Sequence, residues 1–411
     1  MKTEILVYAD WFGHDAPILV GKLSADTVRG AEQFRFAYES EWLSSDHAQQ
    51  LDPELELYGG DQFANENQNF RVFLDSCPDR WGRRLMKRRE AARAHAEHRK
   101  PRTLMESDYL LGVHDLHRMG ALRFKTDAEG AFLDDDEEMA APPLARLREL
   151  EFAARQVEEK RDVDDEEYRR WLNMLISPGS SLGGARPKAS VIDEEGSLWI
   201  AKFPSRNDDH DVGLWEYVIA ELANDAGIDM PPCRVERLAG PHHTFLTKRF
   251  DRIGDRRLHF SSAMTQLGYD DGERSASYLE LAEFLTKHGS KTAEDLAQLW
   301  RRIVFNIAVS NTDDHLRNHG FIFDETGWRL SKAYDMNPEP TGEGLNLFVS
   351  DNDNRLDFDL AMSVSEFFQL SGPGAAEILT EVRGAVAGWR ATAQRLGLGR
   401  AECEAMAPAF N

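Results

Sequence analysis

The chain has few cysteines and lacks long apolar runs. Cys77, Cys233 and Cys403 are its only cysteines, and none has a Cys-x-x-Cys or Cys/His ligand spacing. The sequence therefore signals neither a disulfide framework nor a zinc site. The apolar run before Asp10 is too short for a signal peptide, and no run approaches membrane-spanning length. We expect a cytoplasmic protein with no membrane partner.

Basic residues are also under-represented. The 411 residues include 72 acidic and 49 basic side chains, which gives a formal net charge of −23. A field of this sign repels phosphates, so we expect poor direct binding to nucleic acid and DNA contact only through a basic partner. A simpler interpretation of the charge is solubility. The length predicts at least two domains.

Three oxygen-bearing side chains follow one another in the last third of the chain. Asn318 lies five residues after Asp313, and Asp335 follows a short apolar hairpin. Phosphoryl transfer from a nucleotide needs a carboxylate for the attacking hydroxyl and oxygen ligands for magnesium. The order is that of a kinase catalytic loop and its metal-binding Asp, although the letters HRD and DFG are absent. The alternative to a catalytic role is that Asp313 and Asn318 only cap the loop, since Asp and Asn are ordinary turn residues.

Two upstream stretches complete this pattern. Residues 180–188 form a small-residue loop whose glycines let backbone N–H groups approach phosphates, and Lys188 adds a cation. The spacing is not that of a Walker loop, and an ordinary turn is the alternative. Residues 198–204 predict a strand that carries Lys202 toward the phosphates of a nucleotide.

Together these stretches resemble the HipA family of bacterial serine/threonine kinase toxins. The resemblance covers nearly the whole chain, and its specificity lies in the order of the motifs. These are RWGR (80–83), MGALRF (119–124), SLGGARPKA (181–189), IAKFP (200–204), LTKRFDR (246–252), NTDDHLRNHGF (311–321) and LSKAYDMNP (330–338).

The resemblance implies an α+β, bilobal protein-kinase-like fold, with an N-terminal β-rich module and a mostly helical C-terminal lobe. The alternation of Phe34, Phe36 and Tyr38 predicts a half-buried strand, and the spacing from Leu296 to Ile307 predicts an apolar helix face. The expected divisions are the β-rich module (1–125), an acidic, proline-containing linker and helical connection (126–176), the nucleotide-binding lobe (177–255) and the helical catalytic lobe (256–411).

The resemblance also assigns roles to individual residues. Asp313 is the catalytic base, Asn318 and Asp335 hold Mg²⁺, and Lys202 meets the ATP phosphates. Ser181 is the autophosphorylated serine, with Ser180 and Ser177 as rivals and turn capping as the structural alternative. The nucleotide-binding positions are Gly183, Gly184, Ala185, Arg186, Pro187, Lys188, Lys202, Lys248, Arg249, Phe250, His315, Asn318, Tyr334 and Asp335.

Three features near these motifs allow other interpretations. His315 and His319 lie close enough for a metal pair, but structural support of the catalytic loop is the preferred role. We expect Asp314 to face solvent. The basic helix at 83–93 is interpreted as a solvated face or as a contact with an acidic surface of the same protein, with nucleic-acid contact as the alternative.

The implied function is transfer of the ATP γ-phosphoryl group to a Ser or Thr hydroxyl by the toxin of a type II toxin–antitoxin pair. Its partner would be a small, basic helix-turn-helix antitoxin of the HipB type, and the complex would repress its own operon. An aminoacyl-tRNA synthetase is the best-known target of the family. The alternatives are a degenerate kinase that acts as a co-repressor, and a small-molecule kinase.

Overall fold

The computed structural model describes residues 2–11, 15–65, 69–135, 141–159, 166–176, 184 and 186–411. The chain divides into two compact units. Unit 1 contains Met1–Arg206 and Asp251–Ser261, and unit 2 contains Asn207–Phe250 and Ser262–Asn411. The four functional divisions expected from the sequence stay a prediction, because a division by packing does not test them.

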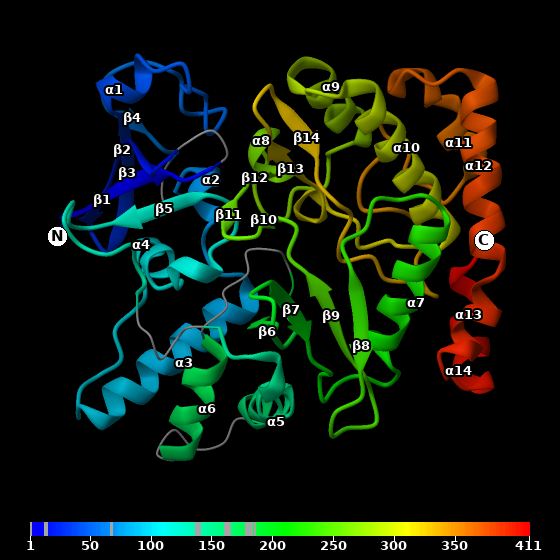
Figure 1. Cartoon of the computed structure of the whole chain (residues 1–411), viewed down its shortest axis with the longest axis horizontal. Coiled ribbons are helices and arrows are strands. Elements are labelled where there is room, and N and C mark those ends of the chain that lie inside the picture. The colour runs from blue at the N-terminus through cyan, green and yellow to red at the C-terminus, as the bar shows by residue number, and fades with distance from the viewer. Residues whose placement is uncertain are drawn as a thin grey trace. The chain divides into compact units, whose positions relative to one another are not determined.

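A five-stranded antiparallel sheet forms the first part of unit 1 (Figure 1). Its order is β4-β3-β2-β1-β5. The strands are β1 (Lys2–Ala9), β2 (Ile18–Val28), β3 (Ala31–Tyr38), β4 (Gln62–Phe63) and β5 (Leu122–Lys125). Phe34, Phe36 and Tyr38 are buried in β3, which confirms the strand predicted from their alternation. Arg29 and Gly30 both have positive φ in the β2–β3 turn, as a tight hairpin requires.

Helices and a second hairpin complete unit 1. The hairpin pairs β6 (Lys188–Ile192) with β7 (Leu198–Lys202). The helices are α1 (Ser40–Leu43), α2 (Arg71–Leu74), α3 (Arg80–Ala96), α4 (Glu106–Leu111), α5 (Leu147–Glu158) and α6 (Glu166–Ile176), with 3-10 turns at Asp115–His117 and Leu144–Arg146.

The segment Asp251–Ser261 joins unit 1 from a distant part of the sequence. It carries β10 (Arg252–Ile253), β11 (Arg256–Arg257) and the start of β12 (His259–Ser262). The buried Asp251 carboxylate accepts a hydrogen bond of 2.8 Å from the Gly120 amide. Arg257 donates to the Asp115 carboxylate at 2.9 Å. These contacts fix the returning segment beside the end of the five-stranded sheet.

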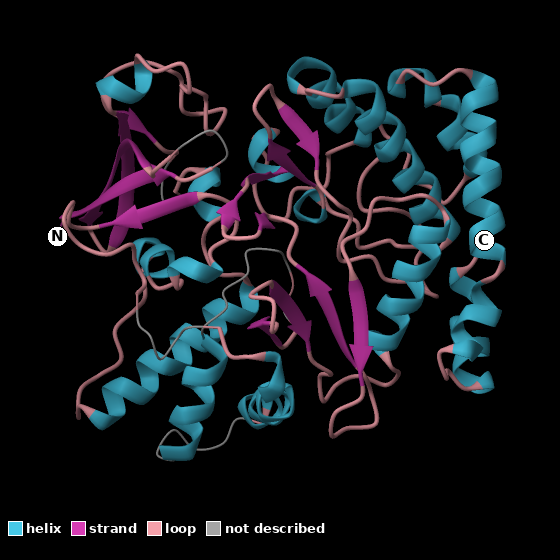
Figure 2. Cartoon of the chain, in the orientation of Figure 1, coloured by secondary structure: helices cyan, strands magenta, loops and turns pink. Residues whose placement is uncertain are grey.

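Unit 2 is mostly helical, as the cyan ribbons of Figure 2 show. Two hairpins accompany its helices: β8 (Cys233–Glu236) with β9 (Thr244–Lys248), and β13 (Gly320–Phe323) with β14 (Trp328–Leu330). The helices are α7 (Val212–Asp225), α8 (Ala263–Gln266), α9 (Tyr278–His288), α10 (Thr292–Ala308), α11 (Phe358–Ser363), α12 (Gly372–Ala387), α13 (Trp389–Arg395) and α14 (Arg400–Met406), with 3-10 turns at Leu316–Asn318, Ser365–Phe368 and Ala407–Ala409.

The core of unit 2 is built around α10. Leu296, Leu299, Trp300 and Ile303 have no exposed surface, which confirms the apolar face predicted for this helix. Burial of such a face stabilises a helix far more than its propensity does. Within the described ranges, no helix is both long and apolar enough to cross a membrane.

Candidate active site

The loop that follows α10 carries the predicted catalytic residues. Ser310 adopts a left-handed conformation (φ 48°) immediately after the helix and turns the chain. Asn311 is buried, and its side-chain amide donates to Asn306 Oδ1 of α10 at 3.1 Å. Its own Oδ1 accepts a hydrogen bond of 3.2 Å from the amide of Asn337. Asn311 therefore fixes the loop to α10 and to the segment that follows Asp335.

Two adjacent carboxylates of this loop lie in opposite environments. Asp313 is exposed, whereas Asp314 is 3% exposed. The prediction that Asp314 faces solvent is therefore wrong. Three donors converge on Asp314 Oδ2: the hydroxyl of Tyr278, the amide of Asn306 at 2.7 Å and Nε2 of His319 at 2.8 Å.

These contacts also set the ionisation of Asp314. Burial alone raises the pKa of this carboxyl, but the charge and hydrogen bond of His319 and the Tyr278 hydroxyl outweigh it, so the net pKa is lowered. The carboxylate is therefore the stable form in the fold. His319 supports the loop through Asp314, in line with the structural role preferred from the sequence. The nucleotide-binding role of His315 stays a prediction; its Nδ1 is buried and has no hydrogen-bond partner among the described residues.

Asn318 is held in a position that suits a metal ligand. The side chain is buried, and its Nδ2 donates to the backbone carbonyl of Asp313 at 3.0 Å. Its Oδ1 is also buried and has no hydrogen-bond partner in the described part of the chain. A buried oxygen without a partner is costly, which favours a bound ligand there. The amide geometry leaves this oxygen, rather than the nitrogen, for a cation.

Tyr334 and Asp335 follow the hairpin β13–β14 after a short extended segment. The Tyr334 hydroxyl donates to the carbonyl of Arg317 at 2.7 Å, which joins this segment to the catalytic loop. Its ring stacks on that of Phe250, with centroids 5.5 Å apart and an angle of 27° between the planes. Asp335 is in the left-handed region (φ 59°), a conformation that Asp tolerates and that is common at functional sites.

Unit 2 thus brings together several residues predicted from the sequence. Direct contacts link Asp313 with Asn318, and Tyr334 with Phe250 and with the catalytic loop. Lys248 ends β9 and is half-buried, and Arg249 is 4% exposed. Asn318 and Asp335 offer oxygen donors, the ligands that Mg²⁺ prefers, and the two stacked rings offer an apolar face for a base. The residues present therefore fit a magnesium–nucleotide complex.

The remaining predicted residues lie in unit 1. Lys202 ends β7 and is half-buried, and Lys188 begins β6 as its cross-strand partner. Gly184 has φ +99°, a conformation that favours glycine. Arg186 is half-buried and the Pro187 carbonyl accepts from the Phe203 amide at 2.9 Å. Gly183, Ala185, Ser181, Ser180 and Ser177 lie outside the described residues.

One contact in unit 1 was not predicted. The ammonium group of Lys188 forms an ion pair of 2.9 Å with Asp79, and both side chains are 4% exposed. Asp79 also caps α3, because its Oδ1 accepts from the Gly82 amide at 2.8 Å. An Asp three residues before Gly82 at the start of a helical pattern is an N-cap signal, but nothing in the sequence indicates its distant partner.

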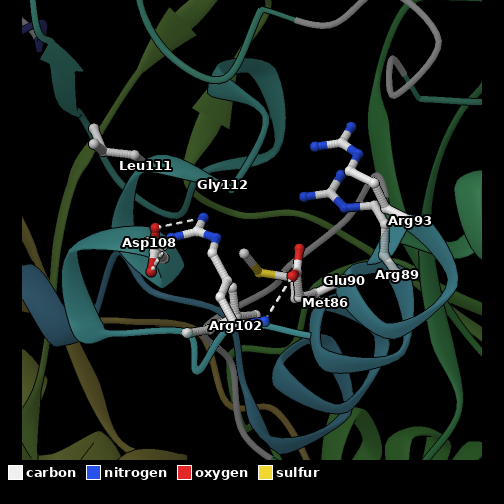
Figure 3. Close-up of a pocket in the computed structure, with 9 residues that line it drawn as sticks. Met86, Arg89, Glu90, Arg93, Arg102, Asp108, Leu111 and Gly112 are labelled. Atoms are coloured by element: carbon white, nitrogen blue, oxygen red, sulfur yellow. Dashed lines mark hydrogen bonds and ion pairs between the residues drawn. The ribbon is translucent and has the colours of Figure 1, made fainter. Parts of the chain in front are cut away.

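A cavity of about 210 Å³ lies in unit 1 between α3 and α4 (Figure 3). Arg102 forms an ion pair of 2.8 Å with Asp108 in its wall, and Glu90 accepts from the Arg102 amide at 2.9 Å. None of the residues predicted for catalysis or nucleotide binding lines it. The lining residues are Met86, Arg89, Glu90, Arg93, Arg102, Leu104, Asp108, Leu111 and Gly112.

Comparisons with known proteins identify relatives of this chain. "Putative kinase Y4mE" from Sinorhizobium fredii is 25% identical over 181 residues, which cover 38% of this chain and 41% of that protein. A protein named "Putative kinase" from Haemophilus influenzae is 24% identical over 182 residues, which cover 38% of this chain and 52% of that protein. The chain thus spans about half or less of the length of these curated relatives.

A solved structure extends the likeness to the whole fold. It is the Shewanella oneidensis MR-1 toxin–antitoxin system HipA, HipB and operator DNA complex, which matches with a TM-score of 0.67 and 16% identity over 98% of this chain and 94% of that chain. This match and the mixture of sheets and helices confirm the predicted α+β, kinase-like fold. A family model described as the HipA-like C-terminal domain matches residues 180–390, which is more than half of the chain. The chain belongs to the family of proteins with a HipA-like C-terminal domain.

Proposed function

We propose that the protein is a kinase that transfers the γ-phosphoryl group of ATP to a Ser or Thr hydroxyl of a protein. One observation carries the proposal: Asn318 donates to the Asp313 carbonyl and leaves its buried Oδ1 for a ligand, beside an exposed Asp313 carboxylate. A base and an oxygen ligand for a metal on one short loop are the parts that phosphoryl transfer requires.

Each residue has a defined role in this reaction. Asp313 orients the attacking hydroxyl and accepts its proton. Asn318 and Asp335 hold Mg²⁺, which neutralises charge on the phosphates when it is bound. Tyr334 and Phe250 offer their ring faces to the adenine. Lys202 balances the negative charge of the phosphates.

The partner of this kinase is proposed to be a helix-turn-helix antitoxin of the HipB type. The fold match to a protein solved with HipB and operator DNA supports this assignment. The net charge of −23 also supports it, because a basic DNA-binding partner would complement it and would bring the complex to DNA. The protein would then act as the toxin of the pair. An aminoacyl-tRNA synthetase is a candidate target on the family resemblance alone.

Self-inactivation is proposed at Ser181. A phosphate there adds about −1.5 to −2 charges at the mouth of the glycine-rich loop, where it competes with the phosphates of ATP. Mass spectrometry after incubation with ATP and magnesium tests this proposal. Phosphate on Ser181 with loss of ATP binding is the expected result, and an unmodified loop in a protein that phosphorylates other targets contradicts it.

Incubation with radiolabelled ATP and a bacterial protein extract tests the kinase assignment itself. We expect label on protein Ser or Thr with the wild-type chain, and labelling that is slower by about a hundredfold or more with Asp313→Asn. Transfer to small molecules alone would favour the small-molecule kinase. ATP binding without any transfer would favour the co-repressor.

A further inference from the structure

Asn411 completes the C-terminal end of α10, the helix that leads into the catalytic loop. The last four carbonyl groups of an α-helix have no partner within the helix. In α10, two of the four accept from backbone amides just beyond the helix end. The Ile307 carbonyl accepts from the side-chain amide of Asn411 at 2.7 Å, and the Ala308 carbonyl accepts from its backbone amide at 2.9 Å. The loop itself offers the Ile307 carbonyl only a longer bond of 3.4 Å, from the Ser310 amide.

The same side chain holds Ser310, the residue at which the chain turns from α10 into the loop. The Asn411 amide donates its second hydrogen to the Ser310 hydroxyl oxygen, at 3.0 Å. Ser310 is 2% exposed and has φ 48°, a left-handed conformation that costs energy for any residue other than glycine. Such a conformation persists only where the surrounding contacts fix it. Asn411 is one of those contacts.

The position of Asn411 is set by its neighbour Phe410. The ring of Phe410 stacks on Trp389 of α13, with centroids 4.1 Å apart and an angle of 7° between the planes. It also lies 6.1 Å from the ring of Trp215 of α7. Aromatic pairs of this kind stabilise a structure beyond the area that they bury. A packed aromatic residue therefore presents Asn411 to the end of α10.

Ser310 connects the two segments that carry the proposed catalytic residues. Asp313, the proposed base, lies three residues after it. The Ser310 carbonyl accepts from the amide of Glu339, which lies in the segment after Asp335, at 3.1 Å. A shift of the Ser310 backbone would therefore change the place of the base. Misplacement of a reacting group by about 1 Å can lower a rate about a hundredfold.

The rings proposed to face the adenine are held by other contacts. Phe250 and Tyr334 stack on each other, and the Tyr334 hydroxyl donates to the carbonyl of Arg317. A change at Ser310 should consequently affect the chemical step more than the binding of ATP. This difference separates a positioning role from general damage to the site.

We propose that Asn411 is a positioning residue for phosphoryl transfer: it fixes Ser310 and the end of α10, and so sets the place of the Asp313 carboxylate. This inference rests on the proposed kinase function and deepens it. It assigns a role in the reaction to the segment that follows α14, which contributes none of the residues predicted for the site.

The test uses Asn411→Ala, Ser310→Ala and the double variant. Asn411 is exposed, so its substitution leaves the packed core unchanged. The measurements are the Kd for ATP, the maximal rate of transfer from radiolabelled ATP to protein in a bacterial extract, and amide hydrogen exchange of residues 305–319 by mass spectrometry. The midpoint of urea unfolding shows that each variant is folded under the conditions of the assay.

We expect Asn411→Ala to lower the maximal transfer rate about tenfold and to leave the Kd for ATP within about twofold of wild type. Amide exchange in residues 305–319 should become about threefold faster or more, because hydrogen bonds that hold this segment are lost. Ser310→Ala should have a smaller effect, since the bond from Asn411 to Ile307 remains. The double variant should match Asn411→Ala, because both substitutions remove the same bond at Ser310.

Three results would overturn the inference. The first is a wild-type transfer rate for Asn411→Ala, and the second is unchanged exchange of residues 305–319 in that variant. The third is a rise in the Kd for ATP as large as the loss in rate, which would mean that Asn411 supports nucleotide binding and not the place of the base.

The matched control is Asn224→Ala. Asn224 is another exposed asparagine of unit 2, and its side-chain amide donates to a helix carbonyl, that of Ala220 in α7, at 3.0 Å. Its substitution should leave the transfer rate, the Kd for ATP and the exchange of residues 305–319 unchanged. An equal loss of rate in this control would show that loss of any such bond slows the enzyme, which also overturns the inference.

Hydrogen exchange keeps this test distinct from the kinase proposal. If wild type transfers phosphate to protein and Asn411→Ala transfers it equally fast, only the role of Asn411 fails. If wild type transfers no phosphate, the kinase proposal fails and the role of Asn411 in the reaction fails with it. Faster exchange in Asn411→Ala would in that case still establish that Asn411 holds the loop.

Discussion

Substitution of Asp314 by Asn should destabilise the protein strongly, although Asp314 is not the proposed base. Its Oδ2 accepts hydrogen bonds from Tyr278, Asn306 and His319, and its side chain is 4% exposed. Hydrogen bonds to a charged group contribute roughly 1.5–3 kcal/mol each, and they are not additive within one cluster. Loss of one member of a buried ion pair costs about 3–5 kcal/mol. We therefore expect the free energy of unfolding to fall by about 3–5 kcal/mol.

The pH dependence gives this prediction a second readout. The fold lowers the pKa of Asp314, so its stabilising contribution is complete above the pKa of the unfolded chain, about 3.9, and is lost as the pH falls through the lower pKa of the folded state. Urea unfolding followed by tryptophan fluorescence, from pH 7 down to the acid limit, measures both effects. The Asn variant should be less stable at neutral pH and should lose less of its remaining stability in acid.

Asp313→Asn is the matched control, since it is the same substitution at the neighbouring position. Because Asp313 is exposed, the free energy of unfolding of this variant should differ from wild type by no more than about 0.5 kcal/mol. Its phosphoryl transfer rate should fall about a hundredfold or more, with nucleotide binding retained. An unchanged unfolding free energy for Asp314→Asn, or a wild-type rate for Asp313→Asn, would refute the assignment of the two carboxylates.

Three further predictions concern the metal, DNA and pH. Asp335→Asn should abolish magnesium-dependent transfer and leave the circular dichroism spectrum unchanged, because it removes a charged ligand and no packing; magnesium-dependent transfer by this variant would contradict its role. The purified protein should bind duplex DNA poorly at physiological salt, since a net charge of −23 opposes phosphate contact; tight, salt-sensitive binding in a gel-shift assay without a partner would reject this and favour DNA contact by the basic helix. Burial raises the pKa of Asp52 to about 6, compared with about 3.9 in the unfolded chain, so the fold favours the protonated form. The free energy of unfolding should therefore rise as the pH falls from about 6 to 4, and this group should contribute roughly 3 kcal/mol. Asp52→Asn should remove that rise in urea unfolding, and an unaltered pH profile would show that Asp52 does not cause it.

The sequence predicts those features that depend on local periodicity. The buried face of α10 and the alternation in β3 are examples, because each residue's environment follows from its neighbours along the chain. Asp313 and Asp314 mark the limit of such reasoning. Two adjacent aspartates look alike in a sequence, and the inward position of Asp314 is decided by Tyr278, 36 positions away.

Asp79 was missed for a related reason. Its cap of α3 is a local signal, but its partner lies in β6, which the chain reaches only after α4, α5 and α6. The nearby contact of Trp81 with Lys188 spans 107 positions. Such pairs depend on tertiary structure alone. The RWGR motif directly after Asp79 is one of the motifs that carry the family resemblance, but the motif does not indicate which residues this region contacts.

The return of Asp251–Ser261 to unit 1 has a consequence for how the protein is synthesised. On the ribosome, the first 206 residues emerge without this segment, so the Gly120 amide lacks Asp251 and the Asp115 carboxylate, although paired with Arg123, lacks Arg257. Unit 1 can complete its folding only after residue 261 has left the exit tunnel, when the first part of unit 2 has also emerged. A fragment that stops at residue 206 should consequently be an unfinished unit, prone to aggregation, and a soluble version would need residues 251–261 supplied by a linker or as a separate peptide.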